Sequence, residues 1–271
     1  MTYRLAVANQ KGGVAKTTTA VNLSASLAYR GFSVLLIDLD PQGNATVGSG
    51  VNPKQLPHTI NEWLLDKATW SEVCTRTPGR YDLLPSTTRL TQAEVHLLQQ
   101  EERQFCLKKH CEPHLSAYDF VIVDCPPSLN TLTINALMMA QAVMIPMQCE
   151  YYALEGIAGL LTTIEQLRRS GHPHLHIHGV LRTMYDGRNR LAQEVSAQLQ
   201  GHFGERLYQT IIPRNVRVAE APSHGLPVLS YEPKSLGAQA YLACADELLQ
   251  RVGLSSAAVE QNQPRVEAEE E

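Results

Sequence analysis

The sequence predicts an α/β protein with a mostly parallel, doubly wound sheet and helices on both faces of the sheet. Apolar runs typical of buried strands occur at residues 3–8, 33–38, 119–124, 142–146 and 179–184. Segments with helical spacing of apolar residues separate several of these runs. This alternation is typical of a parallel sheet that binds its ligand at the carboxyl ends of the strands. With 271 residues, the chain is long enough for one large domain of this kind.

The remaining elements follow from the same patterns. Helices are expected where apolar residues recur with a helical period, and a short additional strand is expected around residues 228–230. The expected helices cover residues 18–29, 132–140, 191–200 and 237–251. No internal repeat interrupts this order.

A glycine-rich loop follows the first predicted strand. Residues 8–18 read A-N-Q-K-G-G-V-A-K-T-T and lead directly into a helix. Glycines let the backbone N–H groups of such a loop surround phosphates, the lysine after them neutralises the β and γ charges, and the next hydroxyl reaches Mg²⁺. The spacing assigns these two roles to Lys16 and Thr17. The dipole of the following helix also favours a bound polyphosphate.

A second lysine, Lys11, stands at the loop entry, next to the position where the usual spacing G-x-x-x-x-G-K-[ST] has its first glycine. The loop resembles that of the deviant Walker A ATPases of the ParA/MinD class, which reads K-G-G-x-G-K-[ST]. The resemblance implies that Lys11 reaches across a dimer interface to the ATP of a partner subunit. The alternative is a solvated charge beside a turn. The loop residues expected to bind ATP are Lys11, Gly12, Gly13, Val14, Ala15, Lys16, Thr17 and Thr18.

Ala15 departs from this class, which usually has glycine at the same position. A methyl group there crowds the loop or requires a particular backbone angle. We expect the alanine to be tolerated if it lies at helical φ in the first turn of the helix. We expect ATP binding to survive, and the size of the effect on affinity stays open.

Aspartates stand at the carboxyl ends of two predicted strands. Asp124 has the position of a Walker B carboxylate, which holds Mg²⁺, usually through water. The resemblance places Asp38 near the Mg²⁺ and assigns Asp40 to the attacking water. Loss of Asp40 is therefore expected to stop hydrolysis while sparing ATP binding. The alternative for Asp38 and Asp40 is that they cap a turn.

Longer sequence blocks narrow the resemblance to the ParA/Soj chromosome and plasmid partition proteins. This resemblance extends from residue 3 to about residue 249. It implies that Glu150 lies near the dimer-facing edge of the nucleotide and that Pro213 and Asn215 lie near the adenine. The blocks are D-L-D-P-Q-G-N-A-T at 38–46, D-C-P-P-S-L at 124–129, Q-C-E-Y-Y-A-L-E-G at 148–156, I-P-R-N-V-R at 212–217 and E-A-P-S-H-G-L-P at 220–227.

The formal net charge of −4 comes from the C-terminal residues alone. Residues 253–271 contain five glutamates and one arginine and few large apolar residues, so we expect a disordered acidic tail after an ATPase domain at 1–252. The rest of the chain is then neutral. Any contact with DNA must depend on a local basic patch.

Members of the resembled family bind DNA without sequence preference once ATP has joined two subunits. Such binding requires cations on phosphates. The candidates are Arg182, Arg188, Arg190, Arg214, Arg217 and Lys234, of which Arg188, Arg190, Arg217 and Lys234 are the predicted contacts. Arg188 and Arg217 best match the family's DNA-contacting positions, and an ordinary solvated surface is the alternative.

The resemblance implies an ATP-dependent homodimer that binds DNA and hydrolyses ATP when a ParB-type centromere-binding protein stimulates it. One alternative is a MinD-like membrane-surface ATPase, which needs a terminal basic amphipathic helix that the acidic C-terminal residues do not supply. Another is a ParA-like ATPase that positions a protein cargo on the nucleoid. No signal-peptide pattern or bilayer-spanning apolar run is present, so we expect a cytoplasmic, nucleoid-associated protein without a membrane partner.

Two further patterns concern metal-binding side chains. The six cysteines form no C-x-x-C pair, which indicates isolated reduced thiols. Alternate histidines at 172–178 would share one face of a strand, as metal ligands do, although a loop entering the next strand explains them better.

Overall fold

The computed structural model describes residues 2–254 and contains an eight-stranded sheet, which confirms the predicted α/β class. The strand order is β3-β4-β2-β5-β1-β6-β7-β8, and all neighbours are parallel except β3 and β4. The strands are β1 (Tyr3–Val7), β2 (Val34–Asp38), β3 (Thr75–Arg76), β4 (Asp82–Leu84), β5 (Phe120–Asp124), β6 (Ala142–Gln148), β7 (His176–Tyr185) and β8 (Leu207–Pro213).

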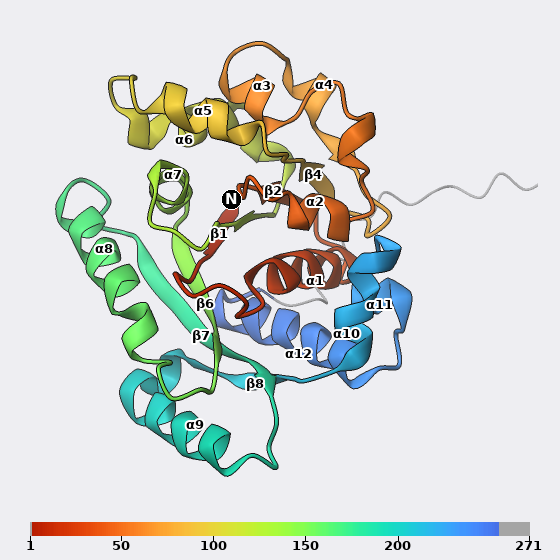
Figure 1. Ribbon diagram of the computed structural model, residues 1–271, viewed down its shortest axis with the longest axis vertical. Helices are drawn as coiled ribbons and strands as arrows, with labels where there is room; N and C mark the ends of the chain where they lie inside the picture. The colour runs from red at the N-terminus through yellow and green to blue at the C-terminus, as the bar shows by residue number, and fades with distance from the viewer. Residues whose placement is uncertain (1, 255–271) are drawn as a thin grey trace, which may run out of the picture.

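Helices cover both faces of the sheet, as Figure 1 shows. On one face α1 and α12 pack against each other, and α7 and α8 lie on the opposite face. The helices are α1 (Lys16–Tyr29), α2 (Asn44–Gly48), α3 (Ile60–Leu64), α4 (Trp70–Val73), α5 (Leu90–Leu97), α6 (Cys106–Cys111), α7 (Thr131–Met139), α8 (Ala158–Arg169), α9 (Arg190–Phe203), α10 (Val216–Glu220), α11 (Val228–Tyr231) and α12 (Leu236–Arg251).

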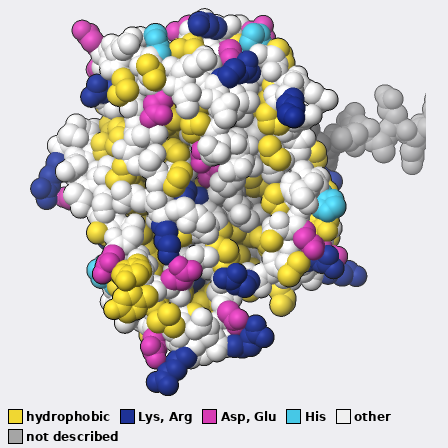
Figure 2. Space-filling view, viewed as in Figure 1, with side chains coloured by type: hydrophobic (Ala, Val, Ile, Leu, Met, Phe, Trp, Pro, Cys, Tyr) yellow, Lys and Arg dark blue, Asp and Glu magenta, His cyan; other side chains and the backbone are white. Residues whose placement is uncertain are grey.

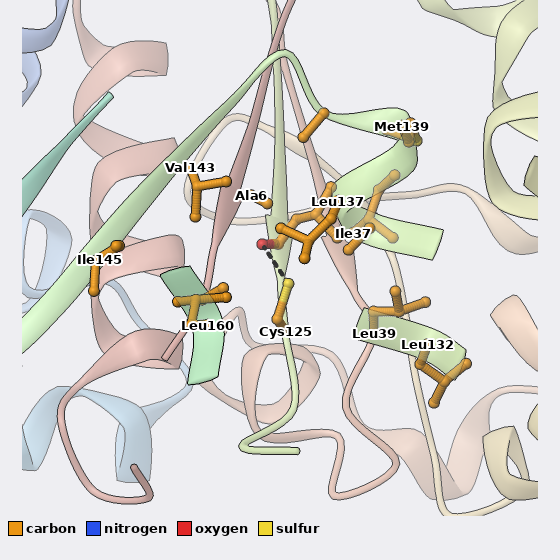
Figure 3. Packing of buried hydrophobic residues seen from close by; sticks show 14 of the residues in the cluster. Ala6, Ile37, Leu39, Cys125, Leu132, Leu137, Met139, Val143, Ile145 and Leu160 are labelled. Atoms are coloured by element: carbon orange, nitrogen blue, oxygen red, sulfur yellow. Dashed lines mark hydrogen bonds between the residues drawn. The ribbon is translucent and has the colours of Figure 1, made fainter. Parts of the chain in front are cut away.

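Each face of the sheet has its own hydrophobic core. Figure 3 shows part of one cluster, where Ala6, Ile37 and Val143 of three strands meet Leu137 of α7 and Leu160 of α8. Burial on both faces explains why the central strands are continuous apolar runs rather than alternating ones. The two cores hold the central strands in place. Their carboxyl ends therefore form a fixed edge on which a site can be built.

All six cysteines are free thiols, distributed along the chain. Cys125 lies in the same apolar cluster, where its thiol points back to the carbonyl oxygen of Val123 at 3.8 Å (Figure 3). Burial raises the pKa of Cys125 well above its usual range. This cysteine is therefore a packing residue rather than a nucleophile.

The prediction of a strand around residues 228–230 is wrong. These residues form the short helix α11, whose first turn is closed by hydrogen bonds from Ser230 and Tyr231 to the carbonyl of Pro227. The N–H group of Val228 donates to the side chain of Asn22 on α1. The last strand is instead β8, whose partly exposed middle residues lack the continuous apolar run by which the other strands were predicted.

Residues 255–271 hold most of the predicted acidic tail and lie outside the described residues. Within residues 2–254, no helix combines the length and the apolar character that crossing a membrane requires.

Candidate functional site

The glycine-rich loop leaves β1 at the centre of the sheet, between β5 and β6. Asn9 fastens the start of this loop to β6, because its amide donates to the carbonyl of Pro146 at 2.8 Å. The Asn9 side-chain oxygen also accepts the N–H of Lys11 at 3.0 Å. Sequence reasoning did not assign a role to Asn9. Its position inside the loop was the one signal that could have indicated a structural role.

Ala15 does not have the helical φ that would have made it easy to accommodate. It lies in the left-handed region at φ 65° and ψ 34°, immediately before α1. This conformation costs an L-residue roughly 1–2 kcal/mol, whereas glycine adopts it freely. No side chain caps the N-terminus of α1, so N–H groups of its first turn remain available for an anion.

Lys16 lies in a cavity of about 540 Å³ in front of the loop. Its ammonium donates to the carbonyl of Lys11 at 3.1 Å, and this hydrogen bond joins the two ends of the loop. Burial lowers the pKa of Lys16, and the nearby carboxylates of Asp124 and Asp40 oppose that effect. The cavity is lined by Gly12, Gly13, Ala15, Lys16, Thr17, Thr18, Val21, Asn22, Asp40, Gln42, Asn44, Val47, Gly48, Pro127, Met184, Pro222 and Leu226.

The side chain of Lys11 does not line the cavity as that of Lys16 does. Its ammonium lies 2.5 Å from a carboxylate oxygen of Glu150, and both side chains are partly exposed. Glu150 itself lines a smaller cavity of about 150 Å³ that shares Met184 with the larger one. Beside it, Tyr151 and Tyr152 are exposed and stack edge to face, with ring centroids 5.0 Å apart. The first loop lysine therefore lies on the surface.

The three aspartates come together beside the loop, but their partners differ. Asp38 and Asp124 are directly paired in the register of β2 and β5. Asp38 accepts hydrogen bonds from the Thr46 N–H and hydroxyl, both at 2.7 Å, and from the Asp40 N–H. Asp40 lies past the end of β2 and caps a turn by accepting the N–H of Gln42 at 2.9 Å.

Both carboxylate oxygens of Asp124 are fully buried, and among the described residues no donor meets hydrogen-bond geometry with them, although the Thr17 hydroxyl lies near enough to lower the pKa of this carboxyl. Burial, and then the charge of Asp38, raise the pKa of Asp124 well above its usual value. Burial also raises the pKa of Asp38 to about 6, although the hydrogen bonds from Thr46 oppose it. An unpaired carboxylate near Thr17 and the phosphate cavity fits a Mg²⁺ site, in which the cation supplies the missing partner.

Pro213 and Asn215 are not among the residues that line the large cavity. Pro213 ends β8, and the Asn215 side chain caps α10 by accepting the N–H of Val218 at 3.3 Å. The cavity wall on that side is formed instead by Met184, Pro222 and Leu226. The adenine contacts assigned to Pro213 and Asn215 stay a prediction.

The predicted DNA-binding arginines are exposed, and each has an acidic neighbour. Figure 2 shows basic and acidic side chains next to each other over the α9 and α10 part of this face. The pairs are Arg188–Asp186 at 2.9 Å, Arg190–Glu194 at 3.0 Å and Arg217–Glu220 at 2.8 Å. Lys234 and Arg214 are also exposed.

Arg182 differs from the other cationic candidates. Its guanidinium donates to the Ser196 hydroxyl at 2.9 Å and to the carbonyl of Tyr208 at 2.8 Å. It therefore joins β7 to α9 and β8, and it is a structural residue. Arg182 therefore shows that a basic residue in this part of the chain can be engaged in hydrogen bonds within the fold.

The histidines of residues 172–178 do not assemble a metal site. In the described part of the chain, no group of three or more His, Cys, Asp or Glu side chains is arranged to hold a metal ion. His172 bonds to the carbonyl of Ala140 at 2.7 Å, and His178 bonds to the Tyr3 hydroxyl at 2.9 Å. These histidines join neighbouring segments at the start of β7.

Comparison with known proteins agrees with this geometry. A family model described as an AAA domain matches residues 2–177. The chromosome-partitioning ATPase Soj of Thermus thermophilus is 49% identical over 250 residues, which cover 92% of this chain and 96% of that protein. The chromosome partitioning protein ParA of Caulobacter vibrioides is 47% identical over 251 residues, which cover 91% of this chain and 94% of that protein.

Solved structures also match along nearly the whole chain. A structure named as cobyrinic acid a,c-diamide synthase from Mycobacterium smegmatis, with bound ADP and magnesium, has a TM-score of 0.82 and 38% identity to this chain. The match covers 93% of this chain and 96% of that one. The similarity therefore includes the sheet, the glycine-rich loop and the helices that surround the cavity.

Proposed function

The chain belongs to the ParA/Soj family of chromosome-partitioning ATPases, and we propose that it is a switch in which ATP joins two copies into a dimer that binds DNA non-specifically. Hydrolysis then separates the copies and releases the DNA. The relatives at 47% and 49% identity are named for chromosome partition, so partition is the role that we carry over to this ATPase.

ATP and Mg²⁺ are the cofactors of this proposal, supported by the relative with bound ADP and magnesium. The loop N–H groups and Lys16 would hold the phosphates, while Thr17 and Asp124, assisted by Asp38, would hold Mg²⁺. The cation supplies charge neutralisation on the phosphate oxygens. Asp40 lines the cavity beside the loop, where it would orient the attacking water.

The observation that carries the dimer step is the direction of Lys11. Lys16 lies in the cavity and can serve the chain's own nucleotide, whereas Lys11 is not among the residues that line that cavity. Lys11 instead pairs with Glu150 on the surface. An exposed pair of this kind contributes only about 0–1 kcal/mol, so Lys11 can exchange Glu150 for a phosphate of a second subunit at little cost.

The DNA surface would be formed by Arg188, Arg190, Arg217 and Lys234. Dimerisation doubles this surface and so couples nucleotide binding to DNA binding, because ATP favours the state in which two copies act together. A ParB-type partner would stimulate hydrolysis. These steps place the protein on the nucleoid in the cytoplasm, with a chromosome, a plasmid or a protein assembly as cargo.

The proposal is tested by retention of the protein on random-sequence DNA with ATP or ADP across a salt series. We expect retention with ATP that falls steeply as salt rises, and weak retention with ADP. Lys11→Ala should lose both the ATP-dependent dimer and the ATP-dependent retention. Lys54→Ala, which removes an exposed lysine outside the site, is the matched control.

Two results would reject the switch. Equal and salt-insensitive retention with ATP and ADP would exclude DNA binding controlled by nucleotide. Dimers of Lys11→Ala that form with ATP as well as those of the parent would exclude the role of Lys11.

A further inference from the structure

Among the residues that line the large cavity, two other than glycine have a positive φ. They are Ala15 in the loop, at φ 65°, and Met184 near the end of β7, at φ 48°. Strained backbone of this kind persists only where surrounding contacts hold it, and it is frequent at functional sites.

Thr183, the residue before Met184, connects the two. Its hydroxyl donates to the carbonyl of Val14 at 3.0 Å, across 169 positions of the chain. Thr183 and Val14 are both buried, and within residues 2–254 no other donor reaches the Val14 carbonyl. Without this hydroxyl, the carbonyl would remain buried and unpaired, which is costly.

The hydrogen bond also decides where the next N–H group points. In a planar trans peptide, the carbonyl of one residue and the N–H of the next point in opposite directions. A Val14 carbonyl held by Thr183 therefore turns the N–H of Ala15 away from the Thr183 hydroxyl. Ala15 lines the cavity, so this N–H group lies at the edge of the space that the nucleotide phosphates would occupy.

We propose that Thr183 is a positioning residue for the phosphate loop: its hydroxyl fixes the Val14–Ala15 peptide, presents the Ala15 N–H to a nucleotide phosphate, and holds the left-handed conformation that alanine resists. The inference rests on the proposed use of this loop for ATP. It also explains how an alanine is accommodated at a position that favours glycine. Glycine at 15 would need the restraint much less, because it adopts this conformation without strain.

The test is a set of four variants whose affinity for ATP is measured by titration calorimetry. Thr183→Val removes the hydroxyl at nearly constant shape. The free loop can then relax to pair the Val14 carbonyl elsewhere, and ATP binding, which must restore the strained conformation, should weaken roughly 10-fold. Thr183→Ser keeps the hydroxyl and should stay within about 2-fold of the parent. Ala15→Gly alone should have a small effect, whereas in the Thr183→Val background it should recover most of the affinity that the valine removes.

Thr162→Val is the matched control, because it removes an exposed hydroxyl that donates to the carbonyl of Ala158 on α8 at 2.9 Å and does not line the cavity. It should leave ATP affinity unchanged. The same variants are compared by thermal unfolding without nucleotide. In that measurement Thr183→Val should lower the midpoint temperature of unfolding. Ala15→Gly should raise this temperature more in the Thr183→Val protein than in the parent.

Three results would overturn the inference. They are ATP binding by Thr183→Val equal to that of the parent, a Thr183→Ser variant as weak as Thr183→Val, and a double variant no better than Thr183→Val alone. A parent protein that binds no ATP would reject the proposed function instead. In that event the unfolding measurements without nucleotide still decide whether Thr183 restrains Ala15.

Discussion

The two halves of the sheet carry their functional charges in opposite ways. At the ends of β2 and β5, Asp38 and Asp124 are buried, and the Asp124 oxygens lack partners among the described residues. Around α9 and α10, beyond β7 and β8, the arginines are exposed and each contacts a nearby acid. The buried aspartates lose their hydration on folding, whereas the exposed arginines keep theirs.

This difference separates two kinds of binding. A buried carboxylate without a partner is neutralised by a proton or by a cation at that place, so under the proposed function the β2–β5 half would select its ligand strongly. An exposed ion pair can exchange its acid for a phosphate with little change in free energy, so under the proposed function the α9–α10 surface would bind many DNA sequences equally. Chemistry should therefore be sensitive to single changes in the first half, and DNA binding only moderately so in the second.

The largest effect is expected from Asp40→Asn. The amide can still accept the N–H of Gln42, but it cannot orient water as a carboxylate does. We expect ATP hydrolysis to fall roughly 10²–10⁴-fold, with ATP affinity nearly unchanged. Phosphate release and equilibrium titration measure the two quantities. Asp246→Asn, at an exposed pair with Arg30, is the control. Parent-like turnover would remove Asp40 from the mechanism.

The next effect concerns His178, a buried group in the β7–β8 half. Burial, with the charge of Arg251 next, lowers the pKa of His178 to about 4 from 6.5. A lowered histidine pKa stabilises the folded state above pH 6.5, and this contribution disappears as the pH falls toward 4. The other groups that face His178 are Tyr3, His176, Tyr208 and Glu247.

Between pH 6.5 and pH 4, the free energy of unfolding of the parent should therefore fall by about 3 kcal/mol more than that of His178→Gln. Urea unfolding at pH 7 and at pH 4 measures the difference. The same acid sensitivity in both proteins would show that another group is responsible.

A smaller effect of opposite sign is expected in the β2–β5 half. Asp124→Asn removes a buried charge, so it should stabilise the nucleotide-free protein by about 1–2 kcal/mol at pH 8. The gain should shrink at pH 5, because the pKa of Asp124 is raised well above its usual value and the penalty for its charge grows only as the pH rises toward that folded-state pKa. Thermal unfolding with a chelator tests this. A less stable variant at pH 8 would contradict the picture of an unsatisfied carboxylate.

The smallest effects are expected on the arginine surface. Arg188→Ala and Arg217→Ala should each weaken DNA binding uniformly across sequences and reduce the salt slope by about 1 for each phosphate that the protein no longer neutralises. Arg168→Ala, which removes a similar exposed pair on α8, is the control. An unchanged slope in both variants would move the DNA surface elsewhere.

The parts that could be predicted from the sequence are those whose signal is local. The loop from Lys11 to Thr18 is continuous, and Asp124 follows an unbroken apolar run, so both could be located without coordinates. Met184 lines the same cavity from far along the chain, and Thr183 beside it bonds to the loop, but a threonine in a strand has no distinguishing pattern. Burial and hydrogen bonding of this kind arise only from tertiary packing.

One wrong prediction and one condition that is not met have the same physical origin. Residues 228–230 are apolar enough for a strand, but the sheet already ends at β8, and the N–H of Val228 is bound by Asn22 instead. A helical φ was the condition for tolerating Ala15 easily, but the turn into α1 requires a left-handed residue at that point. In both cases long-range contacts overruled the local preference.

The N-terminus of α1, which lacks a side-chain cap, has a consequence for heat resistance. A nucleotide phosphate bound there would complete the helix, so part of the protein's folding energy would be supplied from solution. At a nucleotide concentration 100 times the dissociation constant, this adds about 2.7 kcal/mol to the unfolding free energy. The melting temperature should then rise with the ATP concentration, so the stability of the fold would depend on how much nucleotide is present.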